Sequence, residues 1–193
     1  MPVSALKNNL HARIHAATVT GIAYHDIAGA KRDTSQWQFP RAWLDFETIA
    51  FAVPRWIGAK PYEQAPFQFS AHIETKGDAV QHREFQSLTG DDPRRLCAEA
   101  LVELIPASAA VIAYNANFER SCLNRLADLY PDLADKLRSI VTGLVVLTPV
   151  TKANWYHRDQ QGSWSIKYVL PTIAPELNYQ SLDVRDGMAA QAA

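Results

Sequence analysis

The apolar and polar positions change their period along the chain and predict strands first, then mostly helices. Residues 41–51 are apolar at almost every position and lead into a turn containing Pro54 and Gly58, as expected for an interior strand. A second strand is predicted over 67–74 and a third over 80–85, joined as a hairpin. The first part of the sequence therefore indicates a sheet.

Helical spacing follows this β-rich part. A helix capped by Asp91 or Asp92 is predicted to run to residue 105. Residues 109–114 form a continuous apolar run, which is typical of a strand buried on both faces, and a helix capped by Asn117 follows at once. A strand that turns directly into a helix is a common setting for a functional site.

The remaining sequence predicts shorter helices. One covers about 132–140, and another opens at Ser163 or Ser165 and stops at Pro171. An Ala-rich helix is predicted over 182–192. Strands alternating with helices indicate the α/β fold class.

The first 40 residues show no sustained period, although residues 3–15 are helix-like. The sequence therefore predicts an N-terminal extension or connector over 1–40 and one domain over 41–193. Because the helix-like stretch has no evident partner, we expect the domain to be excised from a longer protein.

The composition is that of an ordinary globular protein, with 48% hydrophobic and 20% charged residues. No apolar run approaches the roughly 20 residues of a membrane helix, and the N-terminus does not resemble a secretory signal, so we expect a cytoplasmic protein without a membrane partner. Cys97 and Cys122 fit helical apolar patterns and are interpreted as buried hydrophobes. A net charge of -1 argues against nucleic-acid binding by bulk charge but leaves local contacts open.

Two carboxylates interrupt the first predicted strand. Side chains alternate along a strand, so Asp45 and Glu47 project from one face, while Leu44, Phe46 and Thr48 occupy the other. A buried pair of carboxylates either shares a proton or is neutralised by a cation, most directly a divalent metal ion. Acidic residues on an exposed edge strand are the ordinary alternative, but the apolar surroundings favour an interior strand.

A third carboxylate follows about seventy residues later. The segment Tyr114-Asn115-Ala116-Asn117-Phe118-Glu119 places Glu119 in the first turn of a helix, directly after a buried strand. There a carboxylate can simply complement the positive end of the helix. That role explains Glu119 but not Asn115, a polar residue at the tip of an apolar strand, so both are candidate site residues.

These segments resemble two motifs of the DEDD superfamily of 3'-5' exonucleases. Asp45-Phe-Glu-Thr48 resembles the first motif, Asp-x-Glu on a strand, and residues 114–119 resemble the second, usually written His-Asn-Ala-x-Phe-Asp. Residues 41–190 more closely resemble an uncharacterised bacterial domain family assigned to that class, whose longer members carry a RecB-like nuclease region. The resemblance implies an RNase H-like mixed sheet of about five strands with helices on both faces, and further domains in the parent chain.

The sequence departs from the superfamily pattern in two places. Glu119 stands where most members have Asp, which keeps the charge but changes its reach. The third motif is irregular: the family resemblance falls on Asp186, whereas Tyr179 precedes Asp183 at the spacing that the superfamily uses. We prefer Asp186 as the fourth carboxylate and keep Asp183 as the alternative, because Asp183 suits a helix N-cap.

The resemblance implies a metal-dependent 3'-5' exonuclease that acts on the 3' end of single-stranded DNA or RNA. Four carboxylates would carry catalysis and hold two Mg2+ or Mn2+ ions: Asp45, Glu47, Glu119 and Asp186. Two further residues would bind the substrate: Asn115 and Lys167.

Several alternatives stay open at this point. The general base is either Tyr179 or His157, or the metal alone activates water. Because the third motif is irregular, the main alternative function is a catalytically silent nucleic-acid-binding or interaction domain. An RNase H-like endonuclease or strand transferase is the second.

Overall fold

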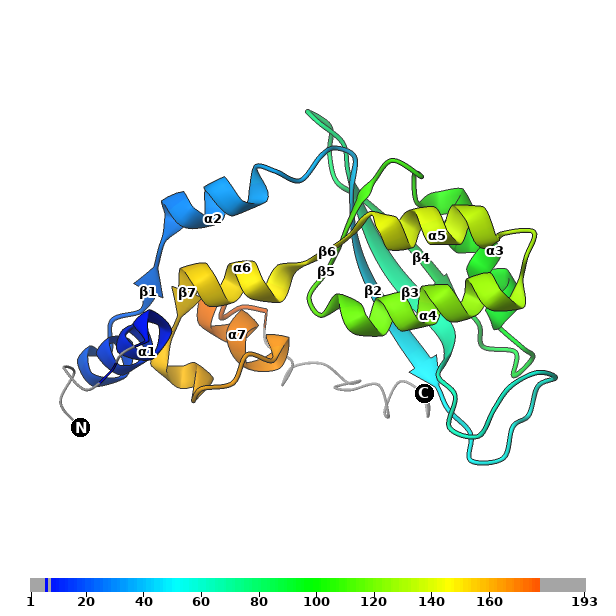
Figure 1. Cartoon of the computed structure of the whole chain (residues 1–193), viewed down its shortest axis with the longest axis horizontal. Helices are drawn as coiled ribbons and strands as arrows, with labels where there is room; N and C mark the ends of the chain where they lie inside the picture. The colour runs from blue at the N-terminus through cyan, green and yellow to red at the C-terminus, as the bar shows by residue number, and fades with distance from the viewer. Residues whose placement is uncertain (1–5, 7, 178–193) are drawn as a thin grey trace. The chain divides into compact units, whose positions relative to one another are not determined.

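A computed structural model describes Leu6 and residues 8–177 of the chain (Figure 1). Contacts divide these residues into two compact units, one running from Trp37 to Val146 and the other combining the residues up to Gln36 with those from Leu147 onward. The sequence prediction instead keeps everything after residue 40 in one domain. Each unit is described separately below.

The unit from Trp37 to Val146 contains a five-stranded mixed sheet, which confirms the predicted α/β class. The strand order is β4-β3-β2-β5-β6, with β3 antiparallel to both β4 and β2, and β5 parallel to both β2 and β6. The strands are β2 (Arg41–Ile49), β3 (Ala65–Glu74), β4 (Gln81–Gln86), β5 (Ala110–Ala113) and β6 (Leu144–Val146).

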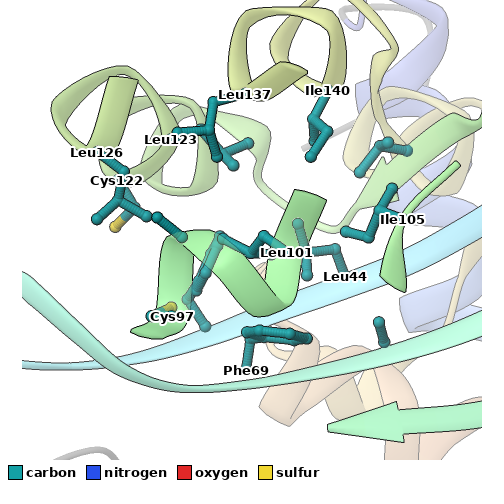
Figure 2. Packing of buried hydrophobic residues seen from close by; sticks show 14 of the residues in the cluster. Leu44, Phe69, Cys97, Leu101, Ile105, Cys122, Leu123, Leu126, Leu137 and Ile140 are labelled. Carbon is teal, nitrogen blue, oxygen red and sulfur yellow. The ribbon is translucent and has the colours of Figure 1, made fainter. Parts of the chain in front are cut away.

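Three helices pack against one face of this sheet: α3 (Arg94–Leu104), α4 (Ala116–Leu129) and α5 (Ala134–Thr142). Their apolar sides meet the strands in one core, in which Leu44 and Phe69 face Leu101 and Leu123 (Figure 2). Cys97 and Cys122 are free thiols buried in this core, which confirms their predicted role as small hydrophobes. The core therefore fixes which face of β2 remains for the acidic residues.

The central strand β2 has one buried face and one accessible face. Leu44, Phe46 and Thr48 are buried, whereas Asp45 is exposed and Glu47 is half-buried. The predicted alternation is confirmed, and β2 is an interior strand of the sheet as expected, but the expected burial of the acidic pair is wrong for Asp45. The core of this unit lies on the side of Leu44 and Phe46, so the acidic side chains point away from it.

The other unit joins segments that are far apart in the sequence. The side-chain amide of Asn154 donates to Asp33 Oδ2 at 2.8 Å, and β1 pairs antiparallel with β7. These long-range contacts explain why the residues from Leu147 onward group with the N-terminal segment. The elements are α1 (Asn9–Thr20), β1 (Tyr24–His25), α2 (Ile27–Thr34), α6 (Leu147–Asn154), β7 (Trp155–Tyr156), the 3-10 helix η2 (Arg158–Gln160) and α7 (Ile166–Ile173).

Two predicted helix boundaries are wrong. Helix α4 has Asn115 rather than Asn117 at its N-cap, because the chain leaves β5 at Ala113 and needs only two residues to turn. Helix α7 continues past Pro171, and the N–H of Ala174 donates to the Leu170 carbonyl at 2.9 Å to close its last turn. The helix predicted over 182–192 lies outside the described residues.

Within the described part of the chain, none of the helices has the length and apolar character needed to cross a membrane.

Gly143 offers a test of how closely the sheet unit is packed. A Cβ atom added there would lie 2.4 Å from the backbone oxygen of Ala109, while the φ of -75° suits any residue. We therefore expect Gly143→Ala to lower the free energy of unfolding by about 1–3 kcal/mol, because backbone must move to relieve the overlap. Urea denaturation measures this, with exposed Lys136→Ala in α5 as the control. An unchanged midpoint for Gly143→Ala would contradict the packing.

Candidate functional site

The antiparallel partner of β2 gives the acidic face a polar setting. Asp45 lies opposite Ser70 of β3, and Glu47 lies opposite Gln68. The hydroxyl oxygen of Ser70 in turn lies within hydrogen-bond distance, 3.0 Å, of Nε2 of His82 on β4. Polar side chains therefore continue across three strands beside the carboxylates.

The parallel partner of β2 leads into the helix that carries the third carboxylate. In β5, Ile112 lies opposite Trp43, so the chain leaves the sheet near the level of Asp45. There the chain turns and enters α4, whose first turn contains Glu119. This connection brings together two segments separated by about seventy residues, as the sequence predicts.

Glu119 is an uncommon buried carboxylate. Its side chain is only 5% exposed, and its Oε2 is buried without a hydrogen-bond partner among the described residues. Burial is the main cause that raises its pKa to about 7, and the negative charge of Asp45 adds to the effect, while a hydrogen bond from its own backbone N–H opposes it. A carboxylate that only complemented the helix end would be better solvated and have a lowered pKa. The helix-end role is therefore insufficient.

Asp45 shares part of this environment. Its pKa is raised because surrounding protein atoms desolvate it, although a hydrogen bond from the backbone N–H of Phe46 acts in the opposite direction. The side chain is nevertheless exposed to solvent. A carboxylate can be partly desolvated by neighbouring protein atoms and still be reached by solvent. A ligand needs the same access.

A divalent cation fits part of this arrangement. Two nearby carboxylates with raised pKa values and one unpaired buried oxygen are oxygen donors that a hard cation such as Mg2+ or Mn2+ would stabilise. However, the described residues contain no group of three or more His, Cys, Asp or Glu side chains placed to hold a metal ion. Asp45 and Glu119, with Glu47 on the same strand face, are therefore the residues that would begin such a site.

The remaining predicted site residues fall in different places. Asn115 is exposed at the N-cap of α4, but its side chain makes no capping hydrogen bond, so capping does not account for its polarity. Lys167 is on α7 in the other unit, where it lines a pocket with His157. Three predicted residues lie outside the described residues: Tyr179, Asp183 and Asp186.

The segment that follows β2 is fastened by two arginines that the sequence reasoning missed. Arg94, 2% exposed, donates to the Ile57 carbonyl at 2.9 Å and to Asp92 Oδ2 at 2.6 Å. Arg125 on α4 donates to the Gly58 carbonyl at 2.8 Å and pairs with Glu63. The sequence signals only the local pair, because Asp92 precedes Arg94 by two residues at the start of a helix. It does not indicate the hydrogen bond from Arg94 to the Ile57 carbonyl.

The pairing with Arg125 also changes the ionisation of Glu63. Burial alone would raise the pKa of Glu63, but hydrogen bonds from Arg125 and from the backbone N–H of Lys60 outweigh it, so the pKa is lowered. Glu63 is thus charged at neutral pH and holds Arg125 in place. Both line a pocket of about 430 Å3 along α4, with Phe118 and Cys122, the neighbours of Glu119.

Together these features define an α/β protein with an exposed carboxylate on its central strand and a buried carboxylate in the first turn of a helix, whose pKa the first one raises. Residues 42–165, more than half of the 193, match the family described as a domain of unknown function (DUF2779), and the chain belongs to that family. The matched segment includes Asp45, Glu47 and Glu119. No curated protein and no solved structure matches the chain.

Proposed function

We propose that this chain is a metal-dependent 3'-5' exonuclease that hydrolyses single-stranded nucleic acid, as its resemblance to the DEDD superfamily implies. The observation that supports the proposal most is the buried, unpaired Oε2 of Glu119, whose pKa is raised by burial and further by the charge of Asp45. Leaving a buried carboxylate oxygen without a partner costs free energy, so a site retained in this form needs a compensating ligand. The partner is the 3' end of DNA or RNA, and we expect the protein to act in the cytoplasm.

The chain's own residues would act mainly by electrostatics and positioning. Without a cation, a pKa of about 7 leaves Glu119 partly protonated at neutral pH, and cation binding would displace that proton. Two bound Mg2+ or Mn2+ ions would supply an activated water and stabilise the leaving 3'-oxygen. Asp45 and Glu47 would hold the ions from the strand, with Glu119 from the helix and Asp186 as the preferred fourth carboxylate.

A catalytically silent nucleic-acid-binding domain is the second candidate. The observation that favours it is the lack of a three-residue metal-ligating group among the described residues. It differs from the first candidate in one measurable respect, because it retains nucleic-acid binding but releases no nucleotides.

Cleavage assays on end-labelled single strands test the proposal. We expect Mn2+ or Mg2+ to support release of mononucleotides from the 3' end of linear DNA or RNA, and EDTA to abolish it. Circular single strands should resist, because an exonuclease needs a free end. The readout is the size of the labelled products over time.

Three outcomes would redirect the proposal. Cleavage of circular strands would indicate an endonuclease. Binding without cleavage under both metals would leave the silent binding domain. Activity that persists in EDTA would contradict a metal-dependent mechanism.

A further inference from the structure

We propose that a pocket at the end of β2 binds one unpaired base of a single-stranded nucleic acid by stacking against Trp56. This inference rests on the proposed function, because it names how the same substrate is held. The pocket has a volume of about 480 Å3, within the range of small-ligand sites. Apolar and aromatic side chains supply most of its walls: Ile49, Phe51, Trp56, Phe67 and Leu88.

Aromatic rings and a guanidinium group lie close together in this pocket. The rings of Phe51 and Trp56 meet edge to face with centroids 5.4 Å apart, and the guanidinium carbon of Arg55 lies 4.3 Å from the centre of the Phe51 ring. Nucleic-acid-binding proteins use both kinds of group to stack unpaired bases. The pocket therefore has the surface chemistry of a base-binding site.

The pocket is held in shape before any ligand arrives. The buried guanidinium of Arg94 lies 5.9 Å from the Trp56 ring centre and donates to the carbonyl of the next residue, Ile57. Tyr62 N–H donates to the Phe51 carbonyl at 2.8 Å, which closes the segment back onto the end of β2. A wall fixed in this way loses little conformational freedom on binding, so stacking contributes more to affinity.

The charges in the pocket favour a base over a phosphate group. Arg55 supplies one positive charge, but Asp91 also lines the pocket and supplies a negative one. A phosphate would be repelled by Asp91. A neutral planar base can stack on the rings and lie beside both Arg55 and Asp91 without repulsion. An apolar side chain of a protein partner is the competing occupant, and it offers no role for Arg55.

The position of the pocket is consistent with a nucleic-acid strand whose 3' end lies at the carboxylates. Ile49 follows Glu47 by two residues, or about 7 Å along the strand. A nucleic acid whose 3' end reaches Asp45 and Glu47 would therefore have one of its last few bases within reach of Trp56. We expect one base position, counted from the 3' end, to dominate the contact.

Binding measurements without cleavage test this inference. Fluorescence anisotropy of 5'-labelled single strands is measured with the full chain carrying Asp45→Asn, alone and combined with Trp56→Ala, Trp56→Phe or Val53→Ala. We expect Trp56→Ala to weaken binding about tenfold and Trp56→Phe to restore most of it, since a ring remains for stacking. Val53→Ala should change affinity less than about twofold, because Val53 is an exposed apolar residue on the same segment that does not line the pocket.

An abasic scan then locates the contact. Oligonucleotides that lack one base at successive positions from the 3' end should show a single position of about tenfold loss, which disappears when Trp56 is already Ala. Unchanged binding in Trp56→Ala, as a pocket for a protein side chain predicts, would overturn the inference. A loss of affinity at one abasic position that persists in Trp56→Ala would also overturn the inference.

The result is separable from the proposed activity. Cleavage by the wild type with no effect of Trp56→Ala would overturn the stacking site alone. Binding through Trp56 without cleavage by the wild type would overturn the exonuclease and keep the stacking site. A protein that neither binds nor cleaves single strands would overturn both.

Discussion

Asp45→Asn is expected to reduce release of nucleotides from single-stranded 3' ends by about a thousandfold. Asparagine keeps the size of the side chain but removes the charge from the central strand, where Asp45 lies beside Glu119. A neutral amide both weakens cation binding and leaves charge that develops during hydrolysis without compensation. Initial rates on 3'-labelled strands at saturating Mn2+ measure the effect.

A matched substitution separates this loss from a general loss of structure. Glu103→Gln removes one exposed carboxylate from α3, and its rate should stay within about twofold of the wild type. Thermal unfolding of Asp45→Asn should be no less cooperative than that of the wild type, since Asp45 is exposed outside the core. A rate for Asp45→Asn within tenfold of the wild type would remove Asp45 from the site.

The same assay chooses between the two candidates for the fourth carboxylate. Asp186→Asn should lose as much activity as Asp45→Asn, whereas Asp183→Asn should retain most of it. The reverse result would assign the fourth position to Asp183. Equal retention of activity in both variants would remove both residues from the site.

Strands β2 to β5 and the acidic pair could be predicted because their signals are local. Alternation along residues 41–49 fixes which side chains share a face, and the apolar run before Asn115 fixes a strand that leads into a helix. The resulting proximity of Asp45 and Glu119 follows from the parallel pairing of β2 and β5. Local pattern and topology here indicate the same site.

The parts that could not be predicted depend on contacts distant in sequence. The pairing of β1 with β7 joins two-residue strands that have no detectable period of their own. The exposure of Asp45 also escapes prediction, because apolar neighbours along β2 indicate burial on both faces, yet the core of this unit lies on one. The pairing of distant strands and the exposure of a strand face depend on which parts of the chain pack against each other. The alternation of apolar and polar residues within one segment does not contain that information.

Glu119→Gln is expected to stabilise the metal-free protein at alkaline pH. The pKa of Glu119 rises from its ordinary value of 4.5 to about 7 in the folded chain, so the folded state binds the proton more tightly than the unfolded state. The wild type therefore loses stability as the pH rises from about 4.5 through about 7, where the buried carboxylate must ionise. Glutamine remains neutral and avoids this cost, which amounts to about 3 kcal/mol above the folded pKa.

Urea denaturation in EDTA at about pH 4 and about pH 8.5 measures this difference. We expect the two proteins to be nearly equal at the lower pH, where Glu119 is protonated in both states, and the variant to be more stable at the higher pH. Glu103→Gln, which alters an exposed carboxylate, should show no such pH-dependent gain. Added Mn2+ should stabilise the wild type more than Glu119→Gln, because the variant lacks one of the four proposed carboxylate ligands. A variant no more stable than the wild type at the higher pH would mean that Glu119 Oε2 is solvated or paired, and the proposed function would lose the observation that supports it most.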